Sequence, residues 1–175
     1  MNIVLVGYRC SGKTTVGKIL AYKMGREFID TDQVIEEIMS CPISSIVAQK
    51  GWNYFREIEK KVIRESSRLN DRVIATGGGA ILDAENVTNL RSNAFLIWLD
   101  GNSDVMKERF KSQHGSAHSR PPLTGADPLE EFDEVMESRR TVYEKAAHYA
   151  VDTSFLTSLE VADSIMRHLP NGERA

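Results

Sequence analysis

The chain reads Gly7-Tyr8-Arg9-Cys10-Ser11-Gly12-Lys13-Thr14 close to its N-terminus, which matches the phosphate-loop pattern G-x-x-x-x-G-K-S/T. An apolar run at 3–6 precedes this motif and a helical pattern at 16–24 follows it, as the motif requires. Backbone N–H groups of such a loop, together with the start of the helix behind it, point at phosphate oxygens. The pattern therefore predicts a nucleotide site in which Lys13 reaches the β- and γ-phosphates and Thr14 ligates Mg²⁺.

Short apolar runs alternate with longer helical patterns along the rest of the chain. This alternation is typical of βα units around a mostly parallel sheet. The run 94–99 is continuously apolar, as expected for a strand that helices cover on both faces. We therefore expect an α/β fold, a three-layer α/β/α sandwich with a five-stranded parallel sheet. The expected strands are 2–6, 27–29, 72–75, 94–99 and 149–151.

Length and composition limit the kinds of protein that this chain can be. Its 175 residues, 41% of them hydrophobic, suffice for one sizeable core, so we expect a single domain over 1–175. A formal net charge of −3 gives no global basic field that would attract nucleic acid or anionic lipid. No apolar run approaches the roughly 20 residues of a membrane span. Two cysteines without paired spacing favour a reducing cytoplasm. We expect a cytoplasmic monomer that binds small molecules.

Unusual residues follow two of the predicted strands. Asp30-Thr31-Asp32 comes after the second strand and Gly77-Gly78-Gly79 after the third, and ligands in open α/β sheets bind outside these strand ends. Of two carboxylates beside a phosphate loop, one can hold hydrated magnesium while the other accepts a proton from an attacking hydroxyl. A helix N-cap explains Asp30 or Asp32 equally well. The glycines fit either a flexible turn or a backbone that a small ligand approaches closely.

Charged residues also fall within the apolar faces of two predicted helices. Arg56 and Glu59 share the apolar stripe of the helix at 52–63, and Arg139 lies at the centre of the stripe at 132–146. A charge turned toward a core is costly unless it is paired or holds an anion. A carboxylate-binding site, a structural ion pair and a side chain that snorkels to solvent all remain possible explanations.

The segment at about 112–127 has no periodicity and is rich in Gly, Ser, His, Pro and Thr, which predicts a loop or lid. His114 and His118 are four residues apart there, but no cysteine or acidic helix motif accompanies them, so we expect no zinc site. Arg120 precedes two prolines and is either a stiff basic projection toward phosphates or an ordinary surface arginine.

Taken together, these motifs resemble the shikimate kinase family over nearly the whole chain. The matching pieces are the phosphate loop, 28–32, 55–59, 76–80, Arg120-Pro121, Arg139 with Tyr143 four residues later, and 151–153. The resemblance implies a P-loop kinase fold with a lid at about 112–127 and a substrate-binding helical region at about 31–62. It also implies ATP-dependent phosphorylation of the 3-hydroxyl of shikimate, in the chorismate pathway to aromatic amino acids.

The same resemblance implies a role for each matching residue. Lys13, Asp32 and Arg120 would be catalytic, with Asp32 binding the substrate hydroxyls and acting as base. Mg²⁺ would be held by Thr14 and, through water, by Asp30, and Arg109 would lie near the adenine. The residues implied for shikimate are Asp32, Arg56, Gly77, Gly78, Gly79 and Arg139, with the two arginines on the carboxylate. Those implied for ATP are Ser11, Gly12, Lys13, Thr14, Thr15, Arg109 and Arg120.

Three positions depart from the family pattern. Cys10 stands where the family usually has glycine, so we expect a slightly reshaped phosphate loop with all its principal groups retained. Two prolines follow Arg120 where one is usual, and Ser154 occupies a variable loop position. Two other functions stay open: another small-molecule kinase of this fold, such as gluconate kinase, and a nucleotide-binding regulatory module that has lost catalysis.

Overall fold

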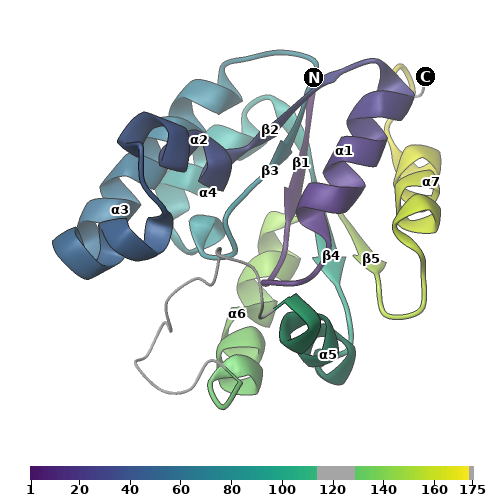
Figure 1. Cartoon of the computed structure of the whole chain (residues 1–175). Coiled ribbons are helices and arrows are strands. Elements are labelled where there is room, and N and C mark those ends of the chain that lie inside the picture. Colours follow the sequence, from purple (N-terminus) through teal and green to yellow (C-terminus); the bar gives the residue numbers. More distant parts are fainter. Residues whose placement is uncertain (114–128, 174–175) are drawn as a thin grey trace.

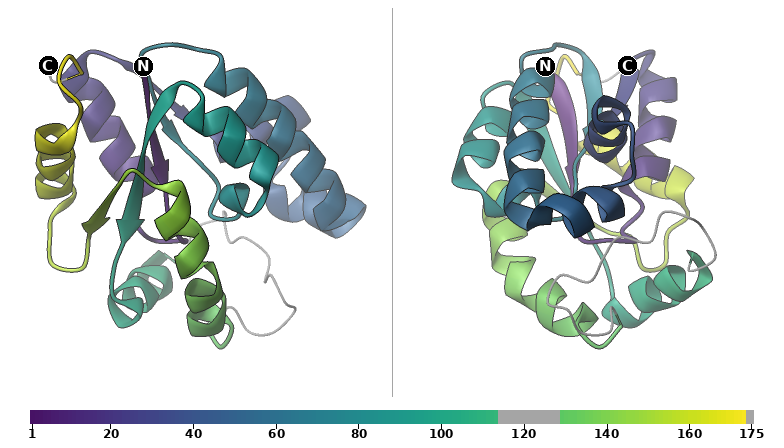
Figure 2. Two further views of the ribbon diagram at one scale, coloured as in Figure 1. Left: turned by 180° about the vertical axis from the view of Figure 1, so that it is seen from behind. Right: turned by 60° about the vertical axis from the view of Figure 1, so that its left-hand side comes forward.

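The computed structural model describes residues 1–113 and 129–173. A parallel sheet with the strand order β2-β3-β1-β4-β5 lies between helices on both of its faces (Figures 1 and 2). The expected three-layer α/β/α sandwich with a five-stranded parallel sheet is therefore confirmed. The strands are β1 (Asn2–Val6), β2 (Glu27–Asp30), β3 (Arg72–Ala75), β4 (Ala94–Asp100) and β5 (Tyr149–Asp152).

Helices cover both faces of this sheet and are numbered in chain order. They are α1 (Lys13–Met24), α2 (Thr31–Met39), α3 (Ile43–Ser67), α4 (Ala84–Arg91), α5 (Ser103–Gln113), α6 (Phe132–Ala146) and α7 (Ser158–His168), and a short 3-10 helix covers Ala80–Leu82. A kink divides α3 at Gly51, whose φ of 80° is non-helical. The region 31–62, which the sequence suggested for the substrate, consists of α2 and most of α3.

Three strands are one residue longer than their apolar runs suggested. They end at Asp30, Asp100 and Asp152 instead of at 29, 99 and 151. The ladder includes these residues because Asp30 pairs with Ala75 and Asp100 pairs with Asp152. Hydrophobic periodicity reports which side chains are buried, whereas strand ends depend on backbone pairing.

Two apolar clusters cover the two faces of the sheet. Val4 and Val6 of β1 point to one face and Ile3 and Leu5 to the other, as the two-residue period of a strand requires. The first pair packs against α3, α4, α5 and α6, and the second against α1 and α7. A third cluster around Ile35 fills the space between α2 and α3. The clusters thus hold α2, α3 and α6 beside the strand ends that carry the candidate site residues.

The lid expected at 112–127 falls only partly within the described residues. Ser112 and Gln113 belong to the last turn of α5, so a loop at these two positions is wrong: the helical hydrogen bonding runs to Gln113. The remainder, with His114, His118 and Arg120, lies outside the described ranges. Within those ranges, no helix combines the length and the apolar character needed to cross a membrane.

Candidate active site

The phosphate loop connects β1 to α1 at the carboxyl end of the central strand. Gly12 is the N-cap of α1 in the left-handed region, with φ 91° and ψ 10°, and its position receives no side-chain cap. The Nζ of Lys13 donates to Gly7 O at 2.9 Å, to Tyr8 O at 2.8 Å and to Ser11 Oγ at 3.3 Å. The buried lysine therefore lies across the loop, with its charge held at the loop's own carbonyl groups.

Besides Gly12, two further positions in this loop have a backbone conformation that favours glycine. Cys10 has φ 61°, in the left-handed region, where the Cβ of a non-glycine residue causes strain. Gly7 has φ 147°, and a Cβ added there would lie 2.6 Å from Leu99 O. Glycine is thus required at position 7 because the backbone of Leu99 lies too close for a side chain. Cys10, by contrast, adopts a conformation that glycine would adopt with less strain.

Asp30 has two roles at once. Its Oδ1 accepts from the backbone N–H of Asp32 at 3.1 Å, which makes Asp30 the N-cap of α2. Its Oδ2 accepts from Thr14 Oγ1 at 2.7 Å. The N-cap and the metal-site explanations of Asp30 are therefore compatible, because the two carboxylate oxygens face different groups.

The Thr14–Asp30 pair has the chemistry of a magnesium site. Both groups offer oxygen atoms, which Mg²⁺ prefers, and Mg²⁺ is usually bound through one or two protein groups plus phosphates and water. No cluster of three or more His, Cys, Asp or Glu that could hold a metal occurs in the part of the chain that the structure describes. The donor set fits an ion that substrate phosphates help to hold. Thr15 follows Thr14 in the first turn of α1 and is also exposed.

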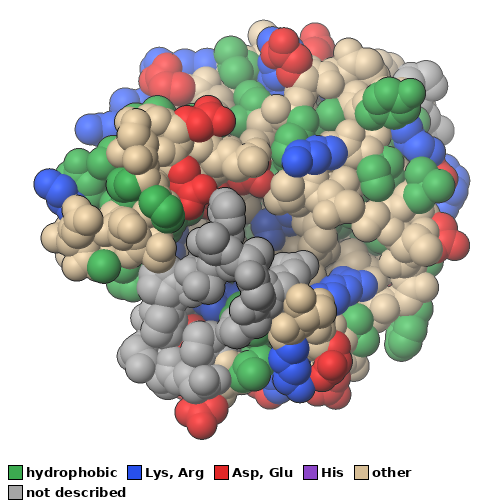
Figure 3. Space-filling view, in the orientation of Figure 1, with side chains coloured by type: hydrophobic (Ala, Val, Ile, Leu, Met, Phe, Trp, Pro, Cys, Tyr) green, Lys and Arg blue, Asp and Glu red, His purple; other side chains and the backbone are tan. Residues whose placement is uncertain are grey.

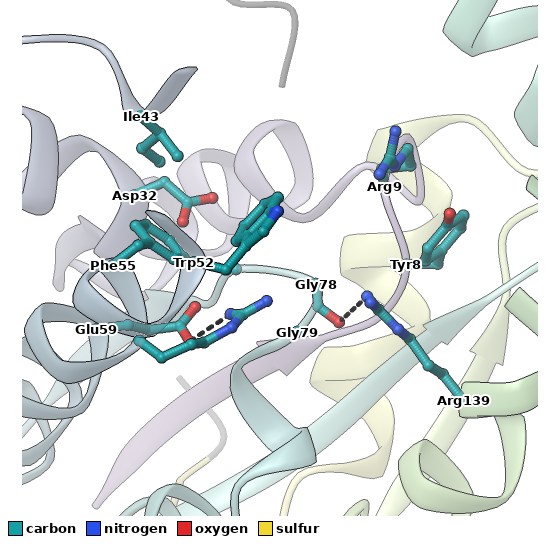
Figure 4. A pocket seen from close by; sticks show the side chains of 12 residues that line it. Tyr8, Arg9, Asp32, Ile43, Trp52, Phe55, Glu59, Gly78, Gly79 and Arg139 are labelled. Atoms are coloured by element: carbon teal, nitrogen blue, oxygen red, sulfur yellow. Dashed lines mark hydrogen bonds and ion pairs between the residues drawn. The ribbon is translucent and has the colours of Figure 1, made fainter. Parts of the chain in front are cut away.

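A pocket lies beside the phosphate loop at the carboxyl ends of β1 and β3. Figure 3 shows the hollow on this face, with acidic and basic side chains at its border, and Figure 4 shows the side chains from α2, α3 and α6 that converge on it. The lining residues are Tyr8, Arg9, Asp32, Ile43, Trp52, Phe55, Arg56, Glu59, Gly77, Gly78, Gly79 and Arg139. All six residues implied for shikimate are among them.

Arg56 and Glu59 form an ion pair in this pocket. Arg56 Nη1 lies 2.5 Å from Glu59 Oε2, and the guanidinium packs over the rings of Trp52 and Phe55 at 5.4 and 5.2 Å. Burial raises the pKa of Glu59 above its ordinary value of 4.5, and the charge and hydrogen bond of Arg56 oppose that rise. Of the explanations that the sequence left open, a structural ion pair therefore applies to Arg56 and Glu59. Arg56 is only half-buried, so a ligand can reach it as well.

The glycines after β3 are crowded by the side chains of the site. A Cβ on Gly77 would lie 2.9 Å from both Asp32 Oδ1 and Glu59 Oε1, and a Cβ on Gly79 would lie 2.4 Å from Arg56 Nη2. Real Cβ atoms do not approach other atoms so closely. A flexible turn is thus not needed to explain the triple glycine, because a larger residue at 77 or 79 would displace the carboxylates or the guanidinium.

Arg139 enters the pocket from α6. Its Nη1 donates to Gly78 O at 3.2 Å, and its guanidinium lies over the Tyr8 ring at 5.7 Å (Figure 4). Tyr143, one turn later, donates to the same carbonyl oxygen. Among the residues within the described ranges, no carboxylate pairs with Arg139, although it is buried. A structural ion pair therefore does not account for this arginine.

Comparisons with known proteins agree with this geometry. Residues 9–170 match the family model described as shikimate kinase. A shikimate kinase of Symbiobacterium thermophilum is 41% identical over 175 residues, with 99% of each chain covered. The chain belongs to the shikimate kinase family. A shikimate kinase 2 of Photorhabdus laumondii is also 41% identical, over 154 residues and 87% of each chain.

A solved structure extends the likeness to three dimensions. It is that of the shikimate kinase from Acinetobacter baumannii in complex with shikimate, which has a TM-score of 0.87 and 32% identity to this chain. The match covers 95% of this chain and 90% of that one. The P-loop kinase fold predicted from the sequence is thus the fold of this family, and the chain is an ATP-dependent phosphotransferase.

Arg109, which the shikimate kinase pattern associates with adenine, is held against the end of β5. Its Nη2 donates to Thr153 O at 2.6 Å and its Nη1 to Thr153 Oγ1 at 3.1 Å. The neighbouring Ser154 Oγ accepts from the backbone N–H of Asn102 at 2.7 Å, which ties the loops after β4 and β5 together. Arg120 is not among the described residues.

Two of the polar residues that line the pocket were not singled out by the sequence. Tyr8 and Arg9 occupy variable positions of the phosphate-loop pattern, yet both side chains line the pocket. The sequence signal was only their place inside the loop, because the pattern assigns no role to these positions. Burial raises the pKa of the Tyr8 hydroxyl above its ordinary value, and the nearby charges of Arg9 and Arg139 oppose that rise.

Proposed function

We propose that this member of the shikimate kinase family phosphorylates the 3-hydroxyl of shikimate with ATP, giving shikimate 3-phosphate and ADP. The observation that carries this proposal is the convergence of Asp32, Arg56 and Arg139 on one pocket beside the phosphate loop. Shikimate is a carboxylated ring with hydroxyl groups. A carboxylate that accepts a proton and two guanidinium groups that bind a carboxylate are the groups that such an acceptor requires.

The proposed transfer uses Asp32 as the base. The acceptor oxygen forms a bond to the γ-phosphorus, the bond from that phosphorus to the β–γ bridging oxygen breaks, and the hydroxyl proton passes to Asp32. Arg56 and Arg139 hold the carboxylate so that the hydroxyl faces the phosphate loop. Glu59 orients Arg56 through their ion pair.

The phosphate side of the reaction belongs to the loop and the start of α1. Lys13 offsets the charge that develops on the transferring group, and Ser11, Gly12 and Thr15 contribute to phosphate binding. Mg²⁺ would supply positive charge that offsets the charge of the phosphates. The 2.7 Å contact between Thr14 Oγ1 and Asp30 Oδ2 supports these two residues as the ones that hold it. Arg109 near adenine and Arg120 near phosphate remain predictions.

The acceptor assay tests this proposal directly. ADP release is measured with shikimate, with gluconate and with nucleoside monophosphates as separate acceptors. We expect stimulation by shikimate alone. Stimulation by gluconate would assign the chain to another small-molecule kinase activity, and tight ATP binding without turnover would identify a regulatory module. We also propose that the protein is a cytoplasmic monomer. Light scattering measures its mass in solution and so tests the oligomeric state.

A further inference from the structure

Arg9 is a third arginine in the wall of the acceptor pocket. In the proposed function Arg56 and Arg139 hold the carboxylate of shikimate, which leaves Arg9 without a role. Its backbone belongs to the phosphate loop, whereas its side chain lines the pocket for the acceptor. Figure 4 shows it beside Tyr8, across the pocket from Asp32. Arg9 therefore stands between the nucleotide and the acceptor sides of the site.

The side chain of Arg9 is held firmly. Its guanidinium carbon lies 5.4 Å from the centroid of the Tyr8 ring and 5.6 Å from that of Phe110, within the range of cation–π contacts. Both rings pack against Phe132, with centroids 4.9 and 5.9 Å away. On another side, Nη2 lies 3.5 Å from Glu131 Oε1. Only 9% of Arg9 is exposed, so its direction is set by packing.

One end of this guanidinium lacks a partner. Nη1 is buried and makes no hydrogen bond to any residue in 1–113 or 129–173. Buried polar groups in native proteins are nearly always satisfied by protein, water or ligand, and an unsatisfied charged donor is especially unfavourable. The contact between Arg9 Nη2 and Glu131 is at the long limit of a hydrogen bond, so Glu131 compensates the charge of the guanidinium only in part. An anionic oxygen is the natural partner for Nη1.

We propose that Arg9 contacts the phosphoryl group on its acceptor side, during transfer and in the phosphorylated product. This inference rests on the proposed function. The phosphoryl oxygens are the ligand atoms that lie between the loop that binds ATP and the pocket that binds shikimate, and Arg9 belongs to both. The planar fork of an arginine matches the oxygens of a phosphoryl group. Arg9 therefore distinguishes the product from the substrate, which lacks this group.

Isothermal titration calorimetry of two ligands tests this inference. Shikimate and shikimate 3-phosphate are titrated separately into wild type, Arg9→Gln and Arg9→Lys. We expect Arg9→Gln to weaken binding of shikimate 3-phosphate by at least about tenfold and binding of shikimate by less than about threefold. Arg9→Lys should recover part of the lost product affinity, because it keeps the charge but not the fork. Equal weakening of both ligands, or no weakening of the product, overturns the inference.

Glu131→Gln is the matched control, because it removes the ion pair and leaves Arg9 in place. If Arg9 acts only through its pair with Glu131, the two glutamine variants lose the same product affinity. We expect Glu131→Gln to keep the product affinity of wild type. Circular dichroism checks folding, and Arg9→Lys carries the test if Arg9→Gln does not fold. If the wild-type protein fails to phosphorylate shikimate, the proposed function is refuted. If the wild-type protein is active but Arg9→Gln binds shikimate 3-phosphate as tightly as wild type does, only the role of Arg9 is refuted.

Discussion

Arg139 and Arg140 are consecutive in α6, yet their guanidinium groups bind different partners. Arg139 Nη1 donates to Gly78 O at 3.2 Å inside the pocket. Arg140 Nη1 pairs with Asp100 Oδ2 at 2.8 Å, and its guanidinium lies over the Trp98 ring at 5.6 Å. Consecutive residues lie about 100° apart around a helix, so one arginine faces the pocket and the other faces the end of β4.

Arg139→Ala should remove most of the affinity for the acceptor. We expect kcat/KM for shikimate to fall by at least about a hundredfold, because a buried charged group that binds an anionic ligand contributes strongly. The Kd for ATP should change little. Steady-state kinetics and ATP titration measure both quantities. Near-normal shikimate kinetics would refute the carboxylate role.

Arg140→Ala serves as the neighbouring control for that experiment. The loss of the Asp100 pair should lower the free energy of unfolding by at most about 1 kcal/mol, because Arg140 is partly exposed to solvent. Shikimate kinetics should stay close to those of wild type.

Arg139→Lys should restore only part of the shikimate activity that Arg139→Ala loses, because an ammonium cannot reproduce the bidentate geometry of arginine.

Lys13→Met should nearly abolish phosphoryl transfer while the fold persists. The lysine supplies charge stabilisation in the transition state, so we expect kcat to fall by about 10²–10³-fold or more. The variant also loses three hydrogen bonds to Gly7, Tyr8 and Ser11, which should loosen the loop. ADP release and circular dichroism give the two readouts. Unchanged turnover in a folded variant would sink the phosphate-loop assignment.

Cys10 should be protected from alkylation by nucleotide. It lies inside the phosphate loop and is partly accessible, as is Cys41 between α2 and α3. We expect MgATP to slow iodoacetamide modification of Cys10 and to leave Cys41 unchanged. Peptide mass spectrometry follows both thiols in one sample, so Cys41 is the internal reference. Equal Cys10 rates with and without MgATP would show that nucleotide does not cover this position.

Gly77→Ala should impair the acceptor site without unfolding the protein. The added Cβ would lie 2.9 Å from Asp32 Oδ1 and from Glu59 Oε1, so both carboxylates must move. A displacement of about 1 Å in a catalytic group can cost about a hundredfold in rate, so we expect the smaller shift at Asp32 to lower kcat/KM for shikimate by about tenfold. Gly78→Ala is the comparison, since its Cβ would lie no closer than 3.4 Å to Gly7 O. Kinetics of the two variants should differ clearly, and equal losses would contradict the crowding explanation.

The raised pKa of Glu59 should appear in the pH dependence of stability. Because its folded pKa exceeds the ordinary value of 4.5, the folded protein binds this proton more tightly than the unfolded chain does. The contribution of Glu59 to the free energy of unfolding is therefore fully present below pH 4.5 and is lost as the pH rises through the folded pKa. Relative to Glu59→Gln, wild type should lose stability as the pH rises above the ordinary value of 4.5. Urea unfolding measures this difference.

Glu57→Gln is the control for the pH experiment, because Glu57 is exposed on the same helix. Its difference from wild type should show no comparable loss of stability, because burial causes the effect expected at Glu59. A difference between Glu59→Gln and wild type that stays constant with pH would mean that Glu59 titrates alike in the folded and unfolded chains.

The positions of the strands along the chain, and the strand ends at which the candidate site lies, followed largely from local patterns. The ranges predicted for β1 and β3 match the structure, and the run at 94–99 was correctly interpreted as a buried strand. These features depend on neighbours in the sequence, as apolar runs and turn motifs do. Strand ends were less predictable, because Asp30, Asp100 and Asp152 join the ladder through partners far away in the chain.

From its amino-acid sequence alone, the chain could be placed in its family and its phosphate loop could be located, since both depend on residue types at short, fixed spacings. The tertiary structure was needed to see that Asp30 serves α2 and Thr14 together, and that Gly77 is crowded by Asp32 and Glu59. It was also needed to see that Arg9 lines the pocket beside the phosphate loop. These contacts join segments that crossover connections bring together, and their distances follow from how helices pack on the sheet, which no short motif encodes.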